Sequence, residues 1–285
     1  MLIELFIKSY KLVKDNLILI QPLLIFLLLI GLILAPASTG GLNIALIFPI
    51  IGLYCAFGAG WFSMFHKSIQ QSANKKPTAE EKAENTLNLL KEFFPGVVKY
   101  FLKVLAGVVV YSILLIIVVN FFGGIIGSKF IGFPTSVNSA DLWHITMNSD
   151  NAQKLLAKIS AADRIRILQW NLLSFSIMGI FSYLMMFWIQ AMISEDKNPL
   201  SAYLESIRTV FKRPFTTLII FISYWGSIIG ISIVSSMNSL NVVIQILGLM
   251  LVTTATVYFT MMMFLYFEKY RKNTGNNWTN SFRQE

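Results

Sequence analysis

The sequence predicts an all-α membrane protein, a bundle of six transmembrane helices. Its 285 residues are 55% hydrophobic and 13% charged, and the mean hydropathy is +0.66. This composition is more apolar and less charged than that of soluble domains. Six long apolar segments have no Asp, Glu, Lys, Arg or His in their central parts, and each could cross a hydrocarbon core of roughly 30 Å. A polar stripe at helical spacing also occurs twice, each time directly before one of these segments.

We expect the spans at about 17–36, 43–65, 104–127, 168–193, 215–237 and 242–267. The first could instead be a signal peptide, because small residues follow it at 35–38. Its apolar run is longer than a signal core of roughly 7–15 residues, however, which favours an uncleaved span. Residues 1–273 would then form a single transmembrane domain, and 274–285 a polar tail.

Two amphipathic helices are expected to lead into the first and fifth spans. Their polar stripes are Glu4, Lys8, Lys11 and Asp15 in the first and Ser201, Glu205, Arg208 and Lys212 in the second. Both have the spacing i, i+4, i+7, i+11, which places four side chains on one face of a helix. Apolar residues opposite the stripe also match, namely Phe6, Tyr10 and Val13 in the first and Tyr203, Ile207 and Val210 in the second. Such helices are typical of a membrane surface.

A weaker third copy lies between the second and third spans. Glu84, Asn88 and Lys91 repeat the first three positions of the stripe. Pro95 and Gly96 are expected to end this helix before the third span begins. The sequence thus predicts three parallel units, each a surface helix followed by a membrane hairpin, at about 1–66, 84–193 and 201–268.

Positive charge orients the spans with both termini in the cytoplasm. The inside segments would be 1–16, 66–103, 194–214 and 268–285. They hold every Lys and Arg of the chain except Lys129, Lys154, Lys158, Arg164 and Arg166. This distribution follows the positive-inside rule, and an even number of spans agrees with it.

One long external segment, 128–167, would separate the third and fourth spans. Ser139 and Asp150 are placed to cap two short helices within it. These helices could rest on the outer surface as a lid over the bundle, or they could form a specific recognition site.

The sequence offers no catalytic, cofactor-binding or metal-binding site. His66 and His144 are expected on opposite sides of the membrane, so they cannot share a metal ion. Cys55 is the single cysteine, which excludes an internal disulfide and a cysteine-based metal cluster. No zinc-protease, phosphate-binding or dinucleotide-binding motif occurs. The net charge of +9 lies beside the spans, where headgroups are nearer than nucleic acid. We therefore expect no enzyme, no cofactor and no nucleic-acid partner.

Uncharged polar residues in the spans are the remaining candidates for a site. Gln21, Tyr224, Trp225 and Gln245 could line a cavity near the middle of the membrane. Their polar atoms could equally hydrogen-bond between helices. The lack of an ionisable side chain at depth disfavours a proton-driven carrier.

Small residues recur four positions apart on three spans. The sets are Gly52, Ala56 and Gly60, then Gly123 and Gly127, then Gly226 and Gly230. Such spacing lets two helix backbones approach closely. We expect packing within the chain, with the contact face of a homo-oligomer as the alternative.

The stretch around the fourth and fifth spans resembles a known family. Its residues are Ile193-Ser194-Glu195-Asp196-Lys197-Asn198-Pro199-Leu200, then Ser206, Arg208 and Phe211-Lys212-Arg213, followed by another span. This stretch is similar to the multispan membrane domain attached to some bacterial glycerophosphodiester phosphodiesterases, and to related six-span bacterial proteins without an assigned function. The phosphodiesterase barrel with its acidic metal ligands has no counterpart in this sequence. The resemblance therefore implies a bacterial membrane domain and carries over no catalytic residue.

We expect a non-enzymatic protein of the bacterial cytoplasmic membrane, acting as an accessory or scaffold in a lipid, envelope or transport process. Basic residues would contact anionic headgroups at roughly 1 kcal/mol each, namely Lys8, Lys11, Lys14, Arg208, Lys212 and Arg213. They could also serve only to orient the protein. The alternative function is a transporter or lipid translocator with a mid-membrane cavity. A second copy or another membrane protein remains open as a partner.

Overall fold

The computed structural model describes residues 2–34, 44–72, 79–132, 159–237 and 242–272. Every regular element in these ranges is helical. The elements are α1 (Leu2–Asp15), the 3-10 turn η1 (Leu17–Leu19), α2 (Ile20–Leu34), α3 (Ile44–Ser72), α4 (Ala79–Phe122), the π-helical turn η3 (Gly123–Gly127), α5 (Ser128–Phe130), α8 (Ala161–Leu184), α9 (Trp188–Glu195), α10 (Pro199–Lys212), α11 (Pro214–Met237) and α12 (Val242–Lys272). The predicted all-α fold is confirmed.

Six helical segments are long and apolar enough to cross a membrane. They are Leu17–Leu34, Ile47–Ser72, Glu84–Phe130, Ala161–Glu195, Pro214–Ser236 and Val242–Lys269. Each overlaps one of the six expected spans, so the prediction of a multispan membrane protein is confirmed. Ser139, His144 and Asp150 lie outside the described residues.

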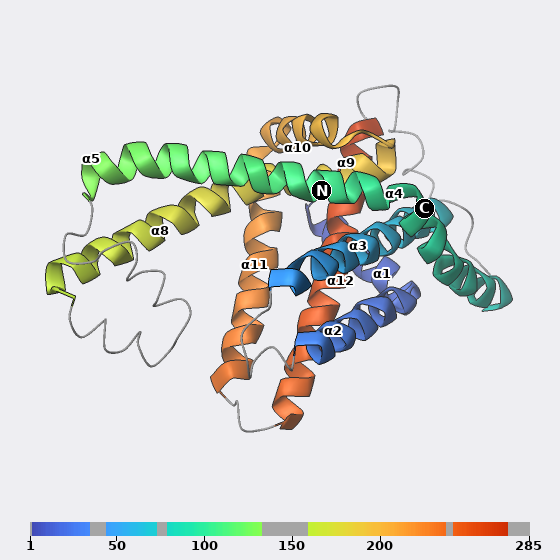
Figure 1. The fold of residues 1–285 in the computed structure, drawn as a ribbon. Coiled ribbons are helices and arrows are strands. Elements are labelled where there is room, and N and C mark those ends of the chain that lie inside the picture. Colours follow the sequence, from blue (N-terminus) through green and yellow to red (C-terminus); the bar gives the residue numbers. More distant parts are fainter. Residues whose placement is uncertain (1, 35–43, 73–78, 133–158, 238–241, 273–285) are drawn as a thin grey trace. The chain divides into compact units, whose positions relative to one another are not determined.

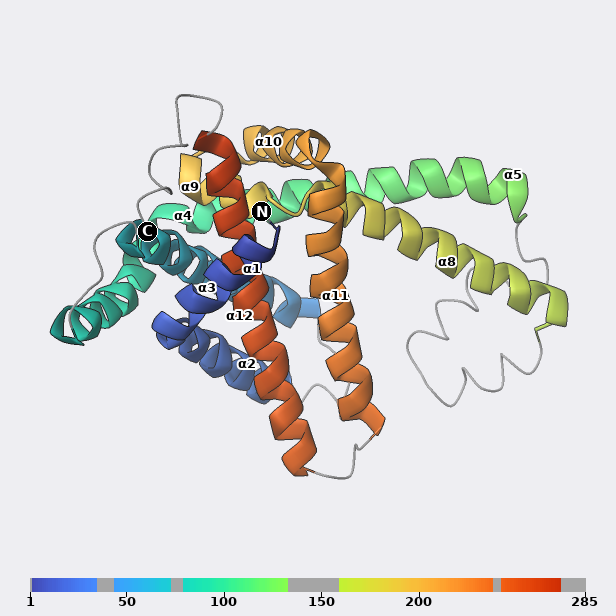
Figure 2. The same ribbon diagram turned by 180° about the vertical axis from the view of Figure 1, so that it is seen from behind.

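The described chain divides into two compact units. Unit 1 comprises residues 1–109 and 184–285, and unit 2 comprises residues 110–183. Within unit 1, α11 and α12 lie side by side (Figures 1 and 2), and α1 packs against α12. The Tyr258 hydroxyl on α12 donates to the Phe6 carbonyl on α1 at 3.2 Å, which links these two helices.

The core of unit 1 forms where α3, α9 and α12 meet. Their fully buried side chains are Met64, Phe65, Met192, Ile193, Met261, Met262, Phe264 and Tyr266. Phe65 stacks on Phe264 with ring centroids 6.0 Å apart, and Phe187 stacks on Tyr266 at 5.3 Å. Aromatic pairs of this kind contribute about 0.5–1.5 kcal/mol beyond their burial. Large side chains therefore fill the centre of this unit.

Glycine brings α3 and α4 into close contact. A Cβ added to Gly60 would lie 2.8 Å from the Phe93 carbonyl oxygen, and one added to Gly96 would lie 2.5 Å from the Ser63 Cβ. The predicted close packing at small residues is thus confirmed at Gly60. Gly52, by contrast, has no atom within 4 Å of such a Cβ.

The expected helix break at Pro95 and Gly96 is wrong. α4 runs from Ala79 to Phe122 with Pro95 inside it. Proline removes one backbone hydrogen bond and bends a helix, and a long apolar helix survives this loss because the turns on either side remain bonded. α4 changes direction near its N-terminal end in both views (Figures 1 and 2). Gly96 serves the contact with α3 rather than a turn.

Unit 2 packs the end of α4 with η3 and α5 against α8. The Tyr111 hydroxyl lies 3.0 Å from the Ser182 Oγ, and the Trp170 Nε1 donates to the Gly132 carbonyl at 3.0 Å. The Trp170 ring lies directly over Gly127, where an added Cβ would meet it. The predicted packing role of small residues is therefore confirmed at Gly127 as well.

Candidate functional site

α1 and α10 bury side chains at matching positions relative to their polar stripes. The buried residues are Leu5, Ser9, Leu12 and Val13 in α1 and Ala202, Tyr203, Ser206, Thr209 and Val210 in α10. Four of them in each helix share the pattern i, i+4, i+7, i+8, which is one face of a helix. Each helix therefore presents the same face to the core of unit 1.

The apolar side expected opposite the charges is divided into two faces. Val13 and Val210 are buried as expected, but Tyr10 is 62% exposed. The second face is an exposed apolar row of Ile3, Ile7 and Tyr10 in α1 and of Leu200, Leu204 and Phe211 in α10. With the charged stripe, each helix thus has three faces rather than two.

The first part of α4 has the same order of faces. Leu89 is fully buried against the core, at the position that corresponds to Ser9 and Ser206. Its exposed apolar residues are Leu87, Leu90 and Phe94. Glu84 and Lys91 of its polar stripe are exposed. This segment differs from α1 and α10 because it continues into its span without a break.

The six basic residues expected at headgroups are all exposed: Lys8, Lys11, Lys14, Arg208, Lys212 and Arg213. Arg208 Nη1 lies 3.8 Å from the Glu205 carboxylate, which is one turn away on the same helix. Exposed pairs of this kind contribute little to stability. Contact with headgroups stays a prediction.

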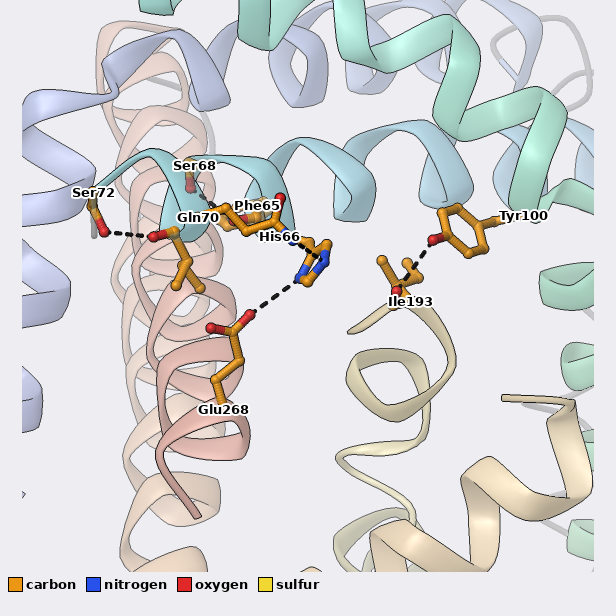
Figure 3. A network of polar contacts seen from close by, with 9 residues as sticks. Phe65, His66, Ser68, Gln70, Ser72, Tyr100, Ile193 and Glu268 are labelled. Atoms are coloured by element: carbon orange, nitrogen blue, oxygen red, sulfur yellow. Dashed lines mark hydrogen bonds and ion pairs between the residues drawn. The ribbon is translucent and has the colours of Figure 1, made fainter. Parts of the chain in front are cut away.

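A histidine and a glutamate join the ends of α3 and α12 (Figure 3). His66 Nδ1 lies 3.1 Å from Glu268 Oε1, and Gln70 Nε2 lies 2.8 Å from His66 Nε2. With the Gln70 amide in this orientation, its nitrogen donates to His66 Nε2, and the tautomer that accepts this bond carries its hydrogen on Nδ1, toward the carboxylate. The residues are 202 positions apart, so no local pattern in the sequence links them.

A second polar group connects α4 to the turn between α9 and α10. Tyr100 donates its hydroxyl to the Ile193 carbonyl at 3.2 Å (Figure 3), and Lys103 Nζ donates to Asp196 Oδ1 at 2.7 Å. Asp196 adopts the left-handed conformation with φ of 53°. The hydrogen bond from Lys103 lowers the pKa of the Asp196 carboxyl. The small stabilisation from this exposed pair is present above the usual aspartate pKa of about 3.9 and is lost as the pH falls through the lowered value.

The stretch that resembles the phosphodiesterase-associated domain forms this turn. Lys197 Nζ contacts the carboxylates of both Glu195 and Glu205, the latter at 2.9 Å. Burial alone would lower the pKa of Lys197, but its hydrogen bonds to the two glutamates outweigh this effect and the pKa is raised. Asn198 caps α10 by accepting from the Ser201 N–H at 2.9 Å, and Pro199 occupies the first turn of α10. The motif therefore has a structural use in this chain.

Ser206 supplies hydrogen bonds to backbone groups at the break between α8 and α9. Its hydroxyl donates to the Leu184 carbonyl at 2.8 Å and accepts from the Phe187 N–H at 3.0 Å. The Tyr203 hydroxyl on the same helix donates to the Gly107 carbonyl of α4 at 2.5 Å. α10 thus supplies hydrogen-bond partners to two neighbouring helices.

The four expected cavity residues occupy different environments. Tyr224 is half-buried, and its ring meets Phe259 edge-on with centroids 5.6 Å apart. Gln21, Trp225 and Gln245 are exposed. Tyr224 and Trp225 contact each other as neighbours in the sequence, and a cavity lined by all four stays a prediction.

The end of unit 1 where His66, Lys103 and Lys197 lie is built from ionisable side chains that pair with one another. Among the residues that the structure describes, no group of three His, Cys, Asp or Glu side chains could hold a metal ion. Comparison of the chain with protein-family models, curated proteins and solved structures finds no match. The resemblance to the phosphodiesterase-associated domain therefore stays a prediction.

Proposed function

We propose that the protein is a non-enzymatic component of a bacterial cytoplasmic membrane, an accessory or scaffold in a lipid, envelope or transport process. Both termini would lie in the cytoplasm, and the three surface helices would be copies of one repeated unit. The matching burial of α1 and α10 supports the repeat. The exposed basic residues of these helices would contact anionic headgroups.

One observation carries this proposal. The ionisable side chains that meet at the end of unit 1 pair with one another: His66 with Glu268, Lys103 with Asp196, and Lys197 with Glu195 and Glu205. A catalytic acid or base must instead reach a substrate atom at hydrogen-bond distance. Pairs that hold helix ends together are what a scaffold requires.

The test is flux through vesicles that contain the purified full-length protein. Vesicles of phosphatidylcholine and phosphatidylglycerol would report lipid scrambling through reduction of a labelled lipid, and leakage through release of a trapped solute. We expect both rates to equal those of protein-free vesicles. Faster scrambling or leakage would support the translocator instead, and its loss in Tyr224→Phe or Gln245→Ala would locate the path.

The scaffold role also predicts a protein neighbour in the native membrane. A photoreactive amino acid at Ser201, on the charged face of α10, should give one discrete protein adduct. The control position is Phe215, which is 81% exposed on α11 and should capture lipid alone. Lipid adducts at both positions would contradict a protein partner on this face.

A further inference from the structure

Three helices of unit 1 expose an apolar row that no part of the described chain covers. We call it the exposed apolar stripe. It consists of Ile3, Ile7 and Tyr10 on α1, Leu87, Leu90 and Phe94 on α4, and Leu200, Leu204 and Phe211 on α10. The least exposed of these side chains is Leu90 at 37%, and the most exposed are Ile3 and Phe94, each at 75%. Repeated exposure of large apolar side chains beside charged ones requires an environment that is itself apolar on one side.

The three faces of each helix lie in different directions. At about 100° per residue, the buried face, the exposed apolar stripe and the charged stripe are each roughly a third of a turn from the other two. A helix in the headgroup plane beside a bundle meets three surroundings in this arrangement. These are the protein on one side, acyl chains below, and headgroups and water above.

The stripe on α4 continues directly into the span. Beyond Phe94, the same helix exposes Val98 at 86% and Leu102 at 73%. Each step of four residues turns this exposed row by about 40° around the helix, toward the side of Lys91. Because α4 is one continuous helix, the surroundings of its span and of its stripe meet along this face. An exposed face of a transmembrane helix is surrounded by lipid acyl chains.

The charges beside the stripe match the same occupant. Lys8, Lys11 and Lys14 lie on α1 next to Ile7 and Tyr10, and all three are exposed. Cationic side chains adjacent to an apolar surface favour anionic phospholipids, whose headgroup and chains lie in the same order.

We propose that the exposed apolar stripe is a lipid-binding surface, inserted at the boundary between headgroups and acyl chains, and that it takes anionic phospholipids. This proposal rests on the surface placement of the helices in the proposed function, and it adds the apolar contact that headgroup attraction alone does not provide. The three stripes would hold unit 1 at a fixed depth in one leaflet.

The depth of single cysteines in the full-length protein tests this surface. Cys55 is 2% exposed and would be replaced by Ala, after which Ile7→Cys reports on the stripe and Lys11→Cys on the charged face. Leu204→Cys and Arg208→Cys form the matching pair on α10. Each carries an environment-sensitive dye in phosphatidylcholine vesicles with and without phosphatidylglycerol. Quenching by lipids spin-labelled near the headgroup is compared with quenching by aqueous iodide.

We expect the ratio of lipid quenching to iodide quenching to be several-fold higher at positions 7 and 204 than at 11 and 208, and to rise with phosphatidylglycerol. Strong iodide quenching at positions 7 and 204 would place the stripe in water and overturn the proposal. Protection from both quenchers would place it against protein and overturn it too. These outcomes do not depend on flux, so the stripe and the scaffold role can fail separately.

The stability of the protein in detergent gives a second check. Ile7→Ser and Leu204→Ser should leave Tm nearly unchanged, because the two side chains are 53% and 58% exposed among the residues that the structure describes. Leu5→Ser, on the buried face of α1, should lower Tm. A similar fall for Ile7→Ser would mean that the stripe is a packing surface and would overturn the proposal.

Discussion

At the scale of single residues, the most consequential side chain is Ser206. The break between α8 and α9 leaves the Phe187 N–H and the Leu184 carbonyl without their helical partners, and one hydroxyl satisfies both. Ser206 and Phe187 are fully buried, so water does not replace this hydroxyl readily. Ser9 occupies the corresponding position in α1 and is equally buried, but its hydroxyl donates only to the Leu5 carbonyl of its own helix.

Ser206→Ala should therefore destabilise the protein far more than Ser9→Ala. Loss of the Ser206 hydroxyl leaves a buried donor and a buried acceptor unpaired, which costs about 1–3 kcal/mol. Ser9→Ala removes a bond to a carbonyl that its own helix already satisfies, so we expect a change within about 0.5 kcal/mol. Reversible unfolding in mixed micelles measures the free energy of unfolding of each variant. Equal losses in the two variants would contradict the role of Ser206 at the break.

At the scale of helices, the crossing of α3 and α4 depends on Gly60 of α3 and Gly96 of α4. Gly60→Ala would bring a Cβ to 2.8 Å from the Phe93 carbonyl oxygen, and a backbone atom cannot move aside cheaply. We expect a loss of about 1–3 kcal/mol in the free energy of unfolding. Gly226→Ala is the matched control, because nothing lies within 4 Å of its added Cβ, and Ala is a better helix former than Gly.

The same two variants separate packing within the chain from packing between chains. Thermal unfolding in detergent should show a lower Tm for Gly60→Ala and an unchanged or higher Tm for Gly226→Ala. Sedimentation of both variants shows whether the mass of the particle changes. A smaller particle for Gly226→Ala would support the homo-oligomer face that the spacing of Gly226 and Gly230 also allows.

The sequence identified the charged faces of α1 and α10 correctly but not the division of their apolar sides. Protein core and lipid chains are both apolar, so the residue types of α1 do not distinguish Val13, which is buried, from Tyr10, which is exposed. The packing of α1 against α12, α3 and η1 makes that distinction. Glycine spacing had the same limit, since Gly52 and Gly60 share a pattern and only the second lies where α4 crosses.

At the scale of the whole molecule, hydropathy was sufficient to predict six spans, because each requires only an apolar run of sufficient length. The polar network was not predictable in this way. His66 and Glu268 each stand at the end of an apolar helix, where a charged residue is common, and their contact depends on how α3 and α12 pack 202 positions apart. The sequence therefore specifies which segments enter the membrane, and packing specifies which of their ends meet.

Orientation is the property of the whole molecule that the distribution of charge predicts. An even number of spans would place both termini on one side, and the positive-inside rule predicts that this side is the cytoplasm. In a Cys55→Ala background, single cysteines at Lys212 and Ser139 would be labelled with a membrane-impermeant maleimide in intact cells. We expect Ser139→Cys to react at once and Lys212→Cys to react only after the membrane is permeabilised, with Lys11→Cys behaving like Lys212→Cys. The reverse labelling pattern would mean that the protein has the opposite orientation in the membrane. Opposite behaviour of positions 11 and 212 would require an odd number of membrane crossings between them.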